Sequence, residues 1–414
     1  MKKNYMLILL TLAAACTQLP HQDQVYTKDI EDKISQVETH LCASPADSNA
    51  WTLSDRMKYY QVEGLSIAVV HNFEVEWARG YGWADVSEHR PVTTRTLFQA
   101  GSISKSLNAV GVMLLVQRHQ LDLNADINTY LKGWKFPYDS VPKGRKITLG
   151  NLLSHTGGLS IHGFPGYVRG DSIPTVEEIL DGKKPANTGA VRSIAEPGTK
   201  FIYSGGGITI SQLIAHDVTG QPYAGFMAHD VLQPMGMDNS SYTQPPPESP
   251  DRATDRATDR PTDRPTDRAT GYLRGDAVVP GKYHIYPEQA AAGLWTTPTD
   301  LGKYIVETQL AYEGKSTKVL DQATTRTRLS PYIDSIDASG TRTGMGVFLF
   351  QRGGRHYFNH NGSDVGFLSS YYGCLESGDG VVVMINNDIN NTLLKEVINS
   401  VARVYHWEGF TLPF

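Results

Sequence analysis

The segment FQAGSISKS, residues 98–106, contains the pair of residues in this chain that is best suited to covalent chemistry. Ser102 and Lys105 are three positions apart, so they lie on one face if a helix begins here. A serine needs a neighbouring group to take its proton, and a lysine can do so when its surroundings lower its pKa. At the first turn of a helix the N–H of Ser102 has no intrahelical partner and can stabilise an oxyanion. The pair therefore indicates acyl transfer through a serine nucleophile.

The same spacing occurs a second time, in Ser140-Val141-Pro142-Lys143. Pro142 and the following Gly144 predict a loop here rather than a helix. Spacing alone is therefore weak evidence, and the surrounding elements must decide which pair is functional.

The elements around the first pair predict an α+β fold. Two β-rich runs, LSIAVV (65–70) and EVEWARG (74–80), flank a short turn and predict an antiparallel hairpin. The middle of the chain, from Phe98 to about Lys303, is mainly helix and loop. Strands return near the C-terminus, at 344–350, 369–375 and 380–388.

Four segments are predicted helices: 29–40, 106–118, 208–220 and the amphipathic 391–407. Strands at both ends with helices between them indicate one antiparallel sheet built from both termini, with flanking helices and an inserted, mainly helical region. A cleft between the sheet and this region is the expected place for a site.

Motifs along residues 30–408 resemble the serine β-lactamase and penicillin-binding-protein superfamily. The resemblance is to the branch that contains class C β-lactamases, D-Ala-D-Ala carboxypeptidases, D-aminopeptidases and related esterases. Eight segments occur in the family's order: GYGWAD (80–85), FQAGSISK (98–105), ITLGNLLSHTGGL (147–159), EPGTKFIYSGGG (196–207), LQPMGM (232–237), ATGY (269–272), AAGLWTTPTDLGKY (291–304) and HNGSDVGF (360–367).

The resemblance implies a role for each matching residue. Ser102 attacks a carbonyl and forms an acyl-enzyme that water hydrolyses. Lys105 and Tyr203 share the proton transfers, with Tyr203 acting as base when neighbouring positive charge lowers its pKa. The N–H groups of Ser102 and Ser363 form the oxyanion site. Gly362 leaves room for a substrate backbone at the strand edge, and Asn361 lies beside it as a substrate-binding residue.

Two departures from the family pattern restrict the substrate. Gly205 stands where the family has an asparagine that binds the substrate amide, and the backbone of residues 205–207 is a candidate replacement. His360 stands where the family has the lysine of Lys-Thr-Gly, so we expect its charge to depend on pH. The resemblance therefore implies a peptidase, aminopeptidase or esterase rather than a dedicated β-lactamase.

Two other matches to family motifs are interpreted as packing. Tyr357-Phe358-Asn359 fits Tyr-x-Asn but directly precedes His360 in a predicted strand. His155 belongs to the LLSHTGGL segment, and we interpret it as structural.

Composition excludes several classes of function. The net charge of -5 gives no basic field for nucleic acid. The 13 histidines show no HExxH, and no CxxC is present, so we expect neither a metal nor a cofactor. The sequence leaves the oligomeric state undetermined.

The N-terminus MKKNYMLILLTLAAAC predicts an export signal over residues 1–15, followed by a tether at 16–28 and a hydrolase domain at 29–408. A cysteine after small residues indicates lipidation of Cys16, and this lipid would be the only membrane attachment. The alternative is ordinary cleavage of the export signal without lipidation. Cys42 and Cys374 can form a disulfide or remain free thiols.

Residues 251–270 consist of five Asp-Arg-(Ala/Pro)-Thr units. Each unit is electrically neutral and has no apolar face, and Pro261 and Pro265 oppose a helix. We predict a surface loop. The last unit runs into the ATGY segment, so it is the copy expected to belong to the domain, and the others are interpreted as a tandem expansion.

Three functions fit this sequence. The first is an exported serine hydrolase of amides in D-amino-acid or cell-wall-type peptides, with weak β-lactamase activity at most. The second is a carboxylesterase, favoured by the missing asparagine. The third is a catalytically silent penicillin- or peptide-binding sensor, against which the intact Ser102, Lys105 and Tyr203 argue.

Overall fold

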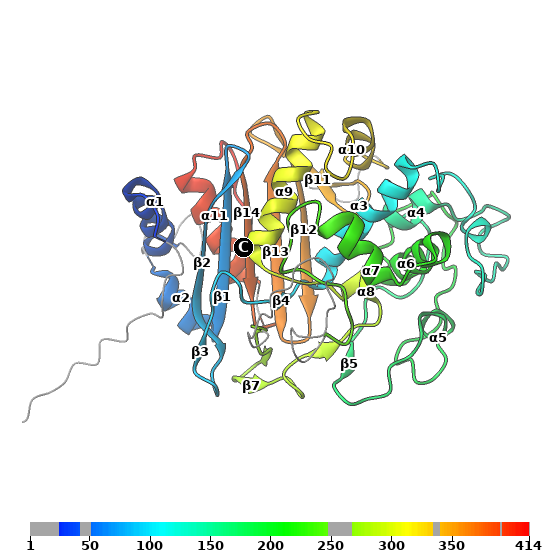
Figure 1. Ribbon diagram of the computed structural model, residues 1–414, viewed down its shortest axis with the longest axis horizontal. Helices are drawn as coiled ribbons and strands as arrows, with labels where there is room; N and C mark the ends of the chain where they lie inside the picture. Colours follow the sequence, from blue (N-terminus) through cyan, green and yellow to red (C-terminus); the bar gives the residue numbers. More distant parts are fainter. Residues whose placement is uncertain (1–24, 42–50, 247–266, 334–339, 390, 414) are drawn as a thin grey trace, which may run out of the picture.

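An eight-stranded antiparallel sheet forms the centre of the molecule (Figure 1), as seen in a computed structural model that describes residues 25–41, 51–246, 267–333, 340–389 and 391–413. Its strand order is β10-β11-β12-β13-β14-β1-β2-β3. The bounds are β1 Gly64–His71, β2 Glu74–Asp85, β3 Arg90–Pro91, β10 Arg342–Thr343, β11 Phe348–Arg352, β12 Arg355–Asp364, β13 Phe367–Cys374 and β14 Gly380–Ile385.

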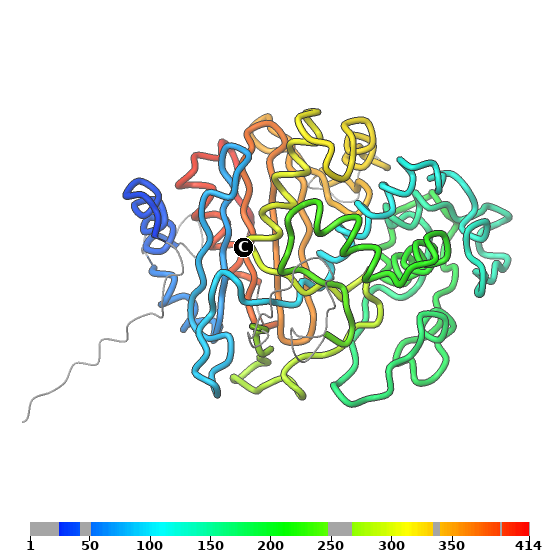
Figure 2. Tube along the Cα trace, viewed as in Figure 1, coloured from blue at the N-terminus to red at the C-terminus, as the bar shows by residue number. Residues whose placement is uncertain are grey.

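The two ends of the chain meet inside this sheet. β1 pairs with β14 in a register that sets Leu65 opposite Ile385 and Val69 opposite Val381. In Figure 2 the blue N-terminal hairpin lies beside the orange and red C-terminal strands, while the cyan and green middle of the chain lies to the right. The predicted α+β fold, with a sheet built from both termini, is confirmed.

Alternating side chains give the sheet two apolar faces. Ile67 of β1 and Val383 of β14 face one core, whereas Val382 and Met384 face the other. The first core is covered by α1 Lys28–Thr39, α2 Leu53–Tyr60 and α11 Thr392–Val404. The second is covered by α9 Pro298–Tyr312 and the helical region.

The helical region supplies the other half of the molecule. Its helices are η1 Gly101–Ile103, α3 Ser104–Gln117, η2 Ile127–Thr129, α4 Leu149–Leu153, α5 Val176–Asp181, α6 Gly205–Thr219, α7 Tyr223–Met227, η3 Ala228–Leu232, α8 Gln289–Ala292 and α10 Gln322–Arg328. Three small strand pairs join them: β4 Phe98–Gln99 with β9 Trp295–Thr296, β5 Tyr167–Val168 with β8 His284–Ile285, and β6 Tyr272–Leu273 with β7 Ala277–Val278.

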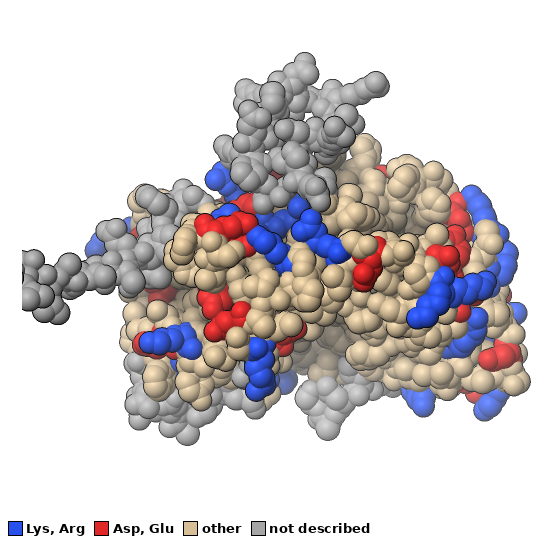
Figure 3. All heavy atoms as spheres, turned by 90° about the horizontal axis from the view of Figure 1, so that it is seen from below, with Lys and Arg blue, Asp and Glu red and all other residues tan. Residues whose placement is uncertain are grey.

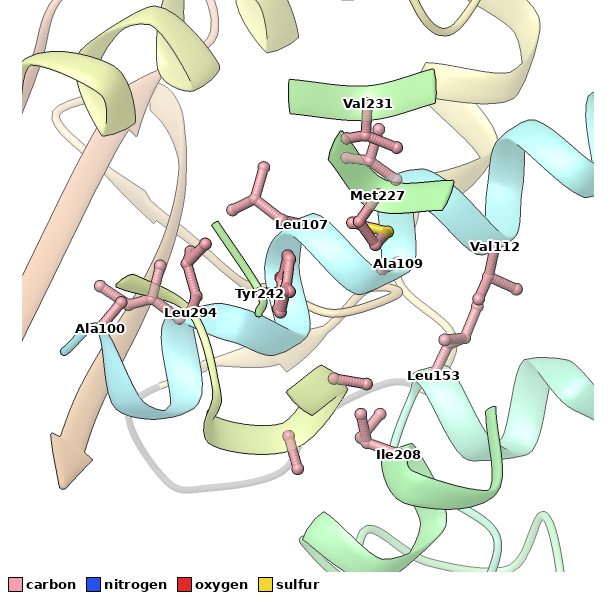
Figure 4. Close-up of a cluster of buried hydrophobic side chains, with 14 of the residues drawn as sticks. Ala100, Leu107, Ala109, Val112, Leu153, Ile208, Met227, Val231, Tyr242 and Leu294 are labelled. Carbon is pink, nitrogen blue, oxygen red and sulfur yellow. The ribbon is translucent and has the colours of Figure 1, made fainter. Parts of the chain in front are cut away.

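Helix α3 is buried on every side from Ser104 to Leu115. Figure 4 shows Leu107 and Ala109 of α3 among Tyr242, Met227 and Val231, contributed by other parts of the helical region. A helix packed on all sides cannot shift without opening its core, so α3 is a rigid base for the residues at its start.

Some predicted bounds were wrong for local reasons. The strand predicted at 344–350 begins only at Phe348, because residues 344–347 form a turn in which Gly344 N–H donates to the Val347 carbonyl at 2.9 Å. Gly346 has a φ of 71° within this turn, a conformation that glycine adopts without strain. The helix predicted at 208–220 starts earlier, at Gly205, because the Ser204 side chain accepts the N–H of Gly207.

The last Asp-Arg-Ala-Thr unit is part of the fold, which corrects the prediction of a surface loop over the whole of 251–270. The Asp267 carboxylate accepts from Arg90 at 2.8 Å, from Thr93 at 2.9 Å and from Thr96 at 3.0 Å. Ala269 and Thr270 are buried. Residues 251–266, which hold the other units, lie outside the described residues.

Other predictions concern parts of the chain that the structure does not describe. Cys374 is buried with a free thiol, while Cys16 and Cys42 lie outside the described residues. Within the described ranges, no helix has the length and apolar character needed to cross a bilayer. On the face shown in Figure 3, Lys and Arg are interspersed with Asp and Glu, so this face has no field of one sign.

Candidate active site

Ser102 lies where the turn η1 meets α3, against the end of β12. Gly101 has a φ of 50°, and a Cβ added to it would lie 2.5 Å from the Ser363 nitrogen. The Ser102 segment and the strand that carries Ser363 are therefore in direct backbone contact, which only glycine at 101 permits. This contact brings together the two residues whose N–H groups the sequence predicts to bind an oxyanion.

Lys105 is hydrogen-bonded to the Ser102 hydroxyl. Its Nζ lies 2.9 Å from Ser102 Oγ and donates to the Ala291 carbonyl at 2.7 Å. The side chain is only 2% exposed. Burial lowers the pKa of Lys105 to about 7, although the charge of Asp364 opposes this shift. At neutral pH a large fraction of Lys105 is therefore a free amine, which can accept the serine proton.

Tyr203 lines the same cleft as Ser102. The Lys105 Nζ is 5.1 Å from the Tyr203 ring centroid. Burial raises the pKa of Tyr203 well above its usual value, and a hydrogen bond with Ser102 only partly offsets that effect. The expectation that positive charge lowers this pKa is wrong, because the effect of burial on the phenol dominates. Tyr203 is therefore a protonated phenol, which leaves Lys105 as the candidate base.

His155 holds Tyr203 in place. The two rings are stacked at a centroid distance of 4.2 Å, and His155 Nδ1 accepts the N–H of Ser204 at 3.1 Å. Burial lowers the pKa of His155 well below its usual range, so the ring is neutral. The prediction of a structural histidine fits this geometry, but the sequence did not reveal that the structure it supports is the active-site tyrosine.

His360 faces the same space from β12. Its Nδ1 lies 2.6 Å from the Asn361 carbonyl, and its ring centroid is 6.2 Å from that of Tyr203. Burial, together with the charge of Lys105, lowers the pKa of His360 to about 3. We expected a charge that depends on pH near neutrality; instead the ring is neutral throughout the physiological range, and Nε2 is available as an acceptor.

The edge of β12 contains the residues that the sequence predicts to bind substrate. The β11 ladder ends at the pair Phe348–Asn359, so within the described chain no strand pairs with residues 360–364 on that side. A Cβ at Gly362 would lie 1.9 Å from the Ala100 carbonyl, which explains the glycine. Asn361 is exposed, and its Oδ1 accepts from Ser370 Oγ at 2.7 Å.

A cleft of about 430 Å³ opens over these residues. Ser102, Tyr203, His360, Asn361, Gly362 and Ser363 all line it. Its walls also contain side chains that the sequence did not single out, many of them apolar: His162, Phe201, Phe348, Leu368, Tyr372, Leu394, Ile398 and Leu412. Most of these residue types are equally common in a hydrophobic core, so the sequence alone could not distinguish them from core residues.

Gly205 does not line the cleft. Its N–H donates to the His162 carbonyl at 3.0 Å, Gly206 donates to the Ile161 carbonyl at 3.0 Å, and Gly207 donates to Ser204 Oγ at 2.9 Å. The predicted compensation by this backbone is therefore wrong, because all three donors are already used. A Cβ at 205 would also lie 3.0 Å from the His162 carbonyl, a contact tight enough that a neighbour must shift slightly for any side chain here.

The second Ser-x-x-Lys pair is a loop, as predicted. Ser140 and Lys143 are exposed, and Lys143 has a φ of 52°. Tyr357 is buried in the core beneath α11. Among the residues that the structure describes, no group of His, Cys, Asp and Glu could hold a metal ion.

Comparison with known proteins gives a consistent result. The profile of the family described as Beta-lactamase matches residues 51–403. The putative penicillin-binding protein PbpX of Bacillus subtilis (strain 168) is 23% identical over 402 residues, covering 95% of this chain and 86% of its own length. Some other relatives are matched over only 35% of their length.

Two solved structures have the same fold. The octameric penicillin-binding protein homologue of Pyrococcus abyssi superposes with a TM-score of 0.68 at 23% identity, covering 86% of this chain and 76% of that one. The D-amino acid amidase of Ochrobactrum anthropi SV3, complexed with L-phenylalanine amide, has a TM-score of 0.68 at 22% identity, covering 91% of this chain and 99% of that one.

Proposed function

Because this chain belongs to the β-lactamase family, we propose that it is a serine hydrolase that forms an acyl-enzyme on Ser102. The observation that carries the proposal is the buried Lys105 amine, 2.9 Å from the Ser102 hydroxyl. We further propose that the scissile bond is an amide in D-amino-acid or cell-wall-type peptides, and that β-lactam turnover is weak at most.

The proposed reaction proceeds in two halves. Lys105 takes the proton of Ser102 as Oγ attacks the carbonyl carbon, and the oxyanion forms beside the N–H groups of Ser102 and Ser363. The proton then passes from Lys105, directly or through the Tyr203 hydroxyl, to the leaving nitrogen, and the C–N bond breaks. In the second half Lys105 takes a proton from water as the water oxygen attacks the acyl carbon. The bond from that carbon to Ser102 Oγ then breaks, and Oγ takes the proton back from Lys105.

The charges of the site support this choice of substrate class. His360 is neutral, so it provides no permanent positive charge for the carboxylate of a β-lactam. Its Nε2 can accept a hydrogen bond from an amide or ammonium group of the substrate. A D-amino acid amidase is among the proteins with this fold, which supports a small amide substrate.

A carboxylesterase is the second candidate. Position 205 lacks a side-chain amide, and the N–H groups of residues 205–207 are used within the protein. An ester substrate has no N–H group for a side-chain amide at position 205 to bind. The absence of that amide should therefore lower the rate of ester hydrolysis less than the rate of amide hydrolysis.

Two assays test the proposal in order. A fluorophosphonate probe and a fluorescent penicillin should each be tried as labels of Ser102; the absence of any adduct would reject the hydrolase and leave a silent binding protein. Turnover of D-alanyl p-nitroanilide should then be compared with that of p-nitrophenyl esters. Amide turnover supports the first candidate, whereas ester turnover alone supports the second.

We also propose that the protein is exported and held in the cell envelope through a lipid on Cys16. Such a location would give a cell-wall-type substrate direct access to the enzyme. Palmitate incorporation that is lost in Cys16→Ser supports this anchor, whereas wild-type protein that incorporates no palmitate and fractionates with the soluble proteins contradicts it.

A further inference from the structure

The cleft over Ser102 extends to both faces of the sheet. Side chains alternate along β12, and Phe358 faces the core under the helical region, whereas Tyr357 faces the core under α11. By the same alternation His360 points to the side of Phe358, and Asn361 points to the side of Tyr357. Because His360 and Asn361 both line the cleft, it passes round the edge of β12 from one face to the other.

The neighbouring strand β13 has the same arrangement. Asn361 is paired with Ser370 of β13, and Asn361 Oδ1 accepts from Ser370 Oγ at 2.7 Å. After Ser370 the side chains again alternate, since Tyr371 packs in the core under the helical region and Tyr372 packs in the core under α11. Ser370 and Tyr372 therefore share the α11 face, and both line the cleft.

The part of the cleft on this face, which we call the α11 half, has mostly apolar walls. These walls are formed by Leu368 and Tyr372 of β13, Leu394 and Ile398 of α11, and Leu412. Among the described residues that line the whole cleft, Lys395 is the only lysine, arginine or carboxylate. Its Nζ donates to the Pro413 carbonyl at 2.9 Å. The α11 half is therefore suited to an apolar group.

The outer wall of the α11 half is held in place by hydrogen bonds. The N–H of Leu412 donates to Asn399 Oδ1 at 2.8 Å, and its carbonyl accepts from Asn399 Nδ2 at 3.0 Å. Lys395 adds the bond to Pro413. Because α11 holds this segment at both residues, the wall is formed before any ligand binds, which lowers the entropic cost of binding.

The geometry of an extended peptide connects the two halves. Within the described chain, no strand pairs with residues 360–364 of β12 on their outer side, so a peptide can add to this edge as a further strand. Successive side chains of such a strand point to opposite faces. The two residues joined by the scissile bond are successive, so one side chain lies on the face of His360 and the other enters the α11 half.

We propose that the α11 half is a side-chain subsite, and that the substrate is a peptide with an apolar residue on one side of the scissile bond. Leu412 is then a specificity-determining residue. The inference deepens the proposed function and rests on it, because it takes Ser102 as the point of attack. A substrate of a single amino acid would fill only one of the two halves with a side chain.

The test compares three peptides: N-acetyl-D-alanyl-D-alanine, N-acetyl-D-alanyl-D-leucine and N-acetyl-D-leucyl-D-alanine. Each hydrolysis releases a free amino group, which fluorescamine detects. Leucine at one of the two positions should raise kcat/KM about 10-fold or more through contact with the α11 half. Leu412→Ala should lower the leucine preference at that position about threefold or more, and should leave the preference at the other position unchanged.

The matched control is Val404→Ala. Val404 also belongs to α11 and packs against the same core, but it does not line the cleft, so its replacement should change neither preference. A structural effect of Leu412→Ala would lower the rates of all three peptides by the same factor and would leave both preferences intact. That result overturns the proposal, as does a wild-type enzyme with no leucine preference at either position, or a loss of preference at both.

Folding and activity can be separated from the subsite. Thermal unfolding identifies a variant that does not fold, and if Leu412→Ala fails in this way, Ile398→Val removes one methyl group from the same wall and should lower the same preference. If wild-type protein hydrolyses none of the peptides, the proposed amide hydrolysis fails. Calorimetric binding of the three peptides to Ser102→Ala then decides the subsite: tighter binding of one leucine peptide supports it, and equal or absent binding overturns it.

Discussion

The tetrads Ser102–Lys105 and Ser140–Lys143 have the same residue types at the same spacing, yet their surroundings differ completely. Lys105 is 2% exposed and donates to the Ala291 carbonyl, whereas Lys143 is 75% exposed and pairs with Glu196 at 3.2 Å. The first tetrad starts a helix that is buried on all sides, and the second is a turn.

The difference shows which feature makes a lysine a base. An exposed lysine is an ammonium ion at neutral pH and has no lone pair to offer. Burial without an ion-pair partner lowers the pKa of a lysine, so the uncharged amine becomes accessible near neutral pH. The backbone carbonyl of Ala291 orients the Lys105 amine but carries no charge that would raise this pKa to its usual value. The spacing provides reach, and the buried environment provides reactivity.

The largest expected effect is that of the nucleophile itself. Ser102→Ala removes the attacking oxygen and should lower the rate of ester or amide hydrolysis about 10⁴-fold or more. Ser140→Ala is the matched change in the exposed tetrad and should leave the rate unchanged. Steady-state kinetics on one p-nitrophenyl ester check both, and a Ser140→Ala defect of similar size would contradict the comparison.

Removal of the base should have the next largest effect. Lys105→Met keeps the length of the side chain but removes the proton acceptor, and should lower the acylation rate about 10²- to 10⁴-fold. Lys143→Met should have no such effect. Stopped-flow acylation measures both rates; a normal rate in Lys105→Met would exclude it as the base.

The same substitution should stabilise the protein. The unfolded chain binds a proton on Lys105 up to its ordinary pKa of 10.5, whereas the folded chain releases that proton near 7. Between these values folding therefore costs free energy, and this cost shrinks as the pH rises through the window. At pH 7 the melting temperature of Lys105→Met should exceed that of wild type, while that of Lys143→Met should not; a fall in Lys105→Met would show that the buried amine is not destabilising.

An intermediate effect is expected for His360. His360→Ala removes a neutral acceptor from the cleft and should lower kcat/KM about 10- to 100-fold, the equivalent of one lost hydrogen bond to substrate. Because the ring is already neutral near pH 7, the midpoint of the pH–rate profile should not move. An unchanged rate would assign His360 to packing, and a moved midpoint would show that it titrates.

The smallest effect extends the comparison to the repeated tetrapeptide. Asp267→Ala removes the acceptor of Arg90, Thr93 and Thr96 and should lower the free energy of unfolding by about 1–3 kcal/mol. Asp251→Ala, the same change in the first unit, and deletion of residues 251–262 should change neither stability nor hydrolysis. Urea unfolding measures the stability of each variant. A large loss of hydrolysis after deletion of residues 251–262 would show that the repeat has a function.

Much of the fold followed from patterns within the sequence. The hairpin at 65–80 and the C-terminal strands were visible as β-rich runs, and motif order identified Ser102, Lys105, Tyr203, His360 and Ser363. In the structure, one cleft is lined by Ser102, Tyr203, His360 and Ser363. Lys105 does not line this cleft but is hydrogen-bonded to Ser102.

The electrostatic states of these residues could not be read from the sequence. The pKa values of Tyr203 and His360 depend on how completely distant segments exclude water from them, and motif spacing contains no information on that. Ala291 contributes only its carbonyl, which every residue possesses.

The Ala291 carbonyl also determines when the proposed site can form. Ser102 and Lys105 are synthesised early, but the carbonyl that accepts from the Lys105 amine comes 186 residues after Lys105, and Ser363, the second residue predicted to bind an oxyanion, comes later still. A growing chain that ends before Ala291 therefore has both side chains without the carbonyl that orients the amine. The site is complete only when the C-terminal strands have joined the sheet.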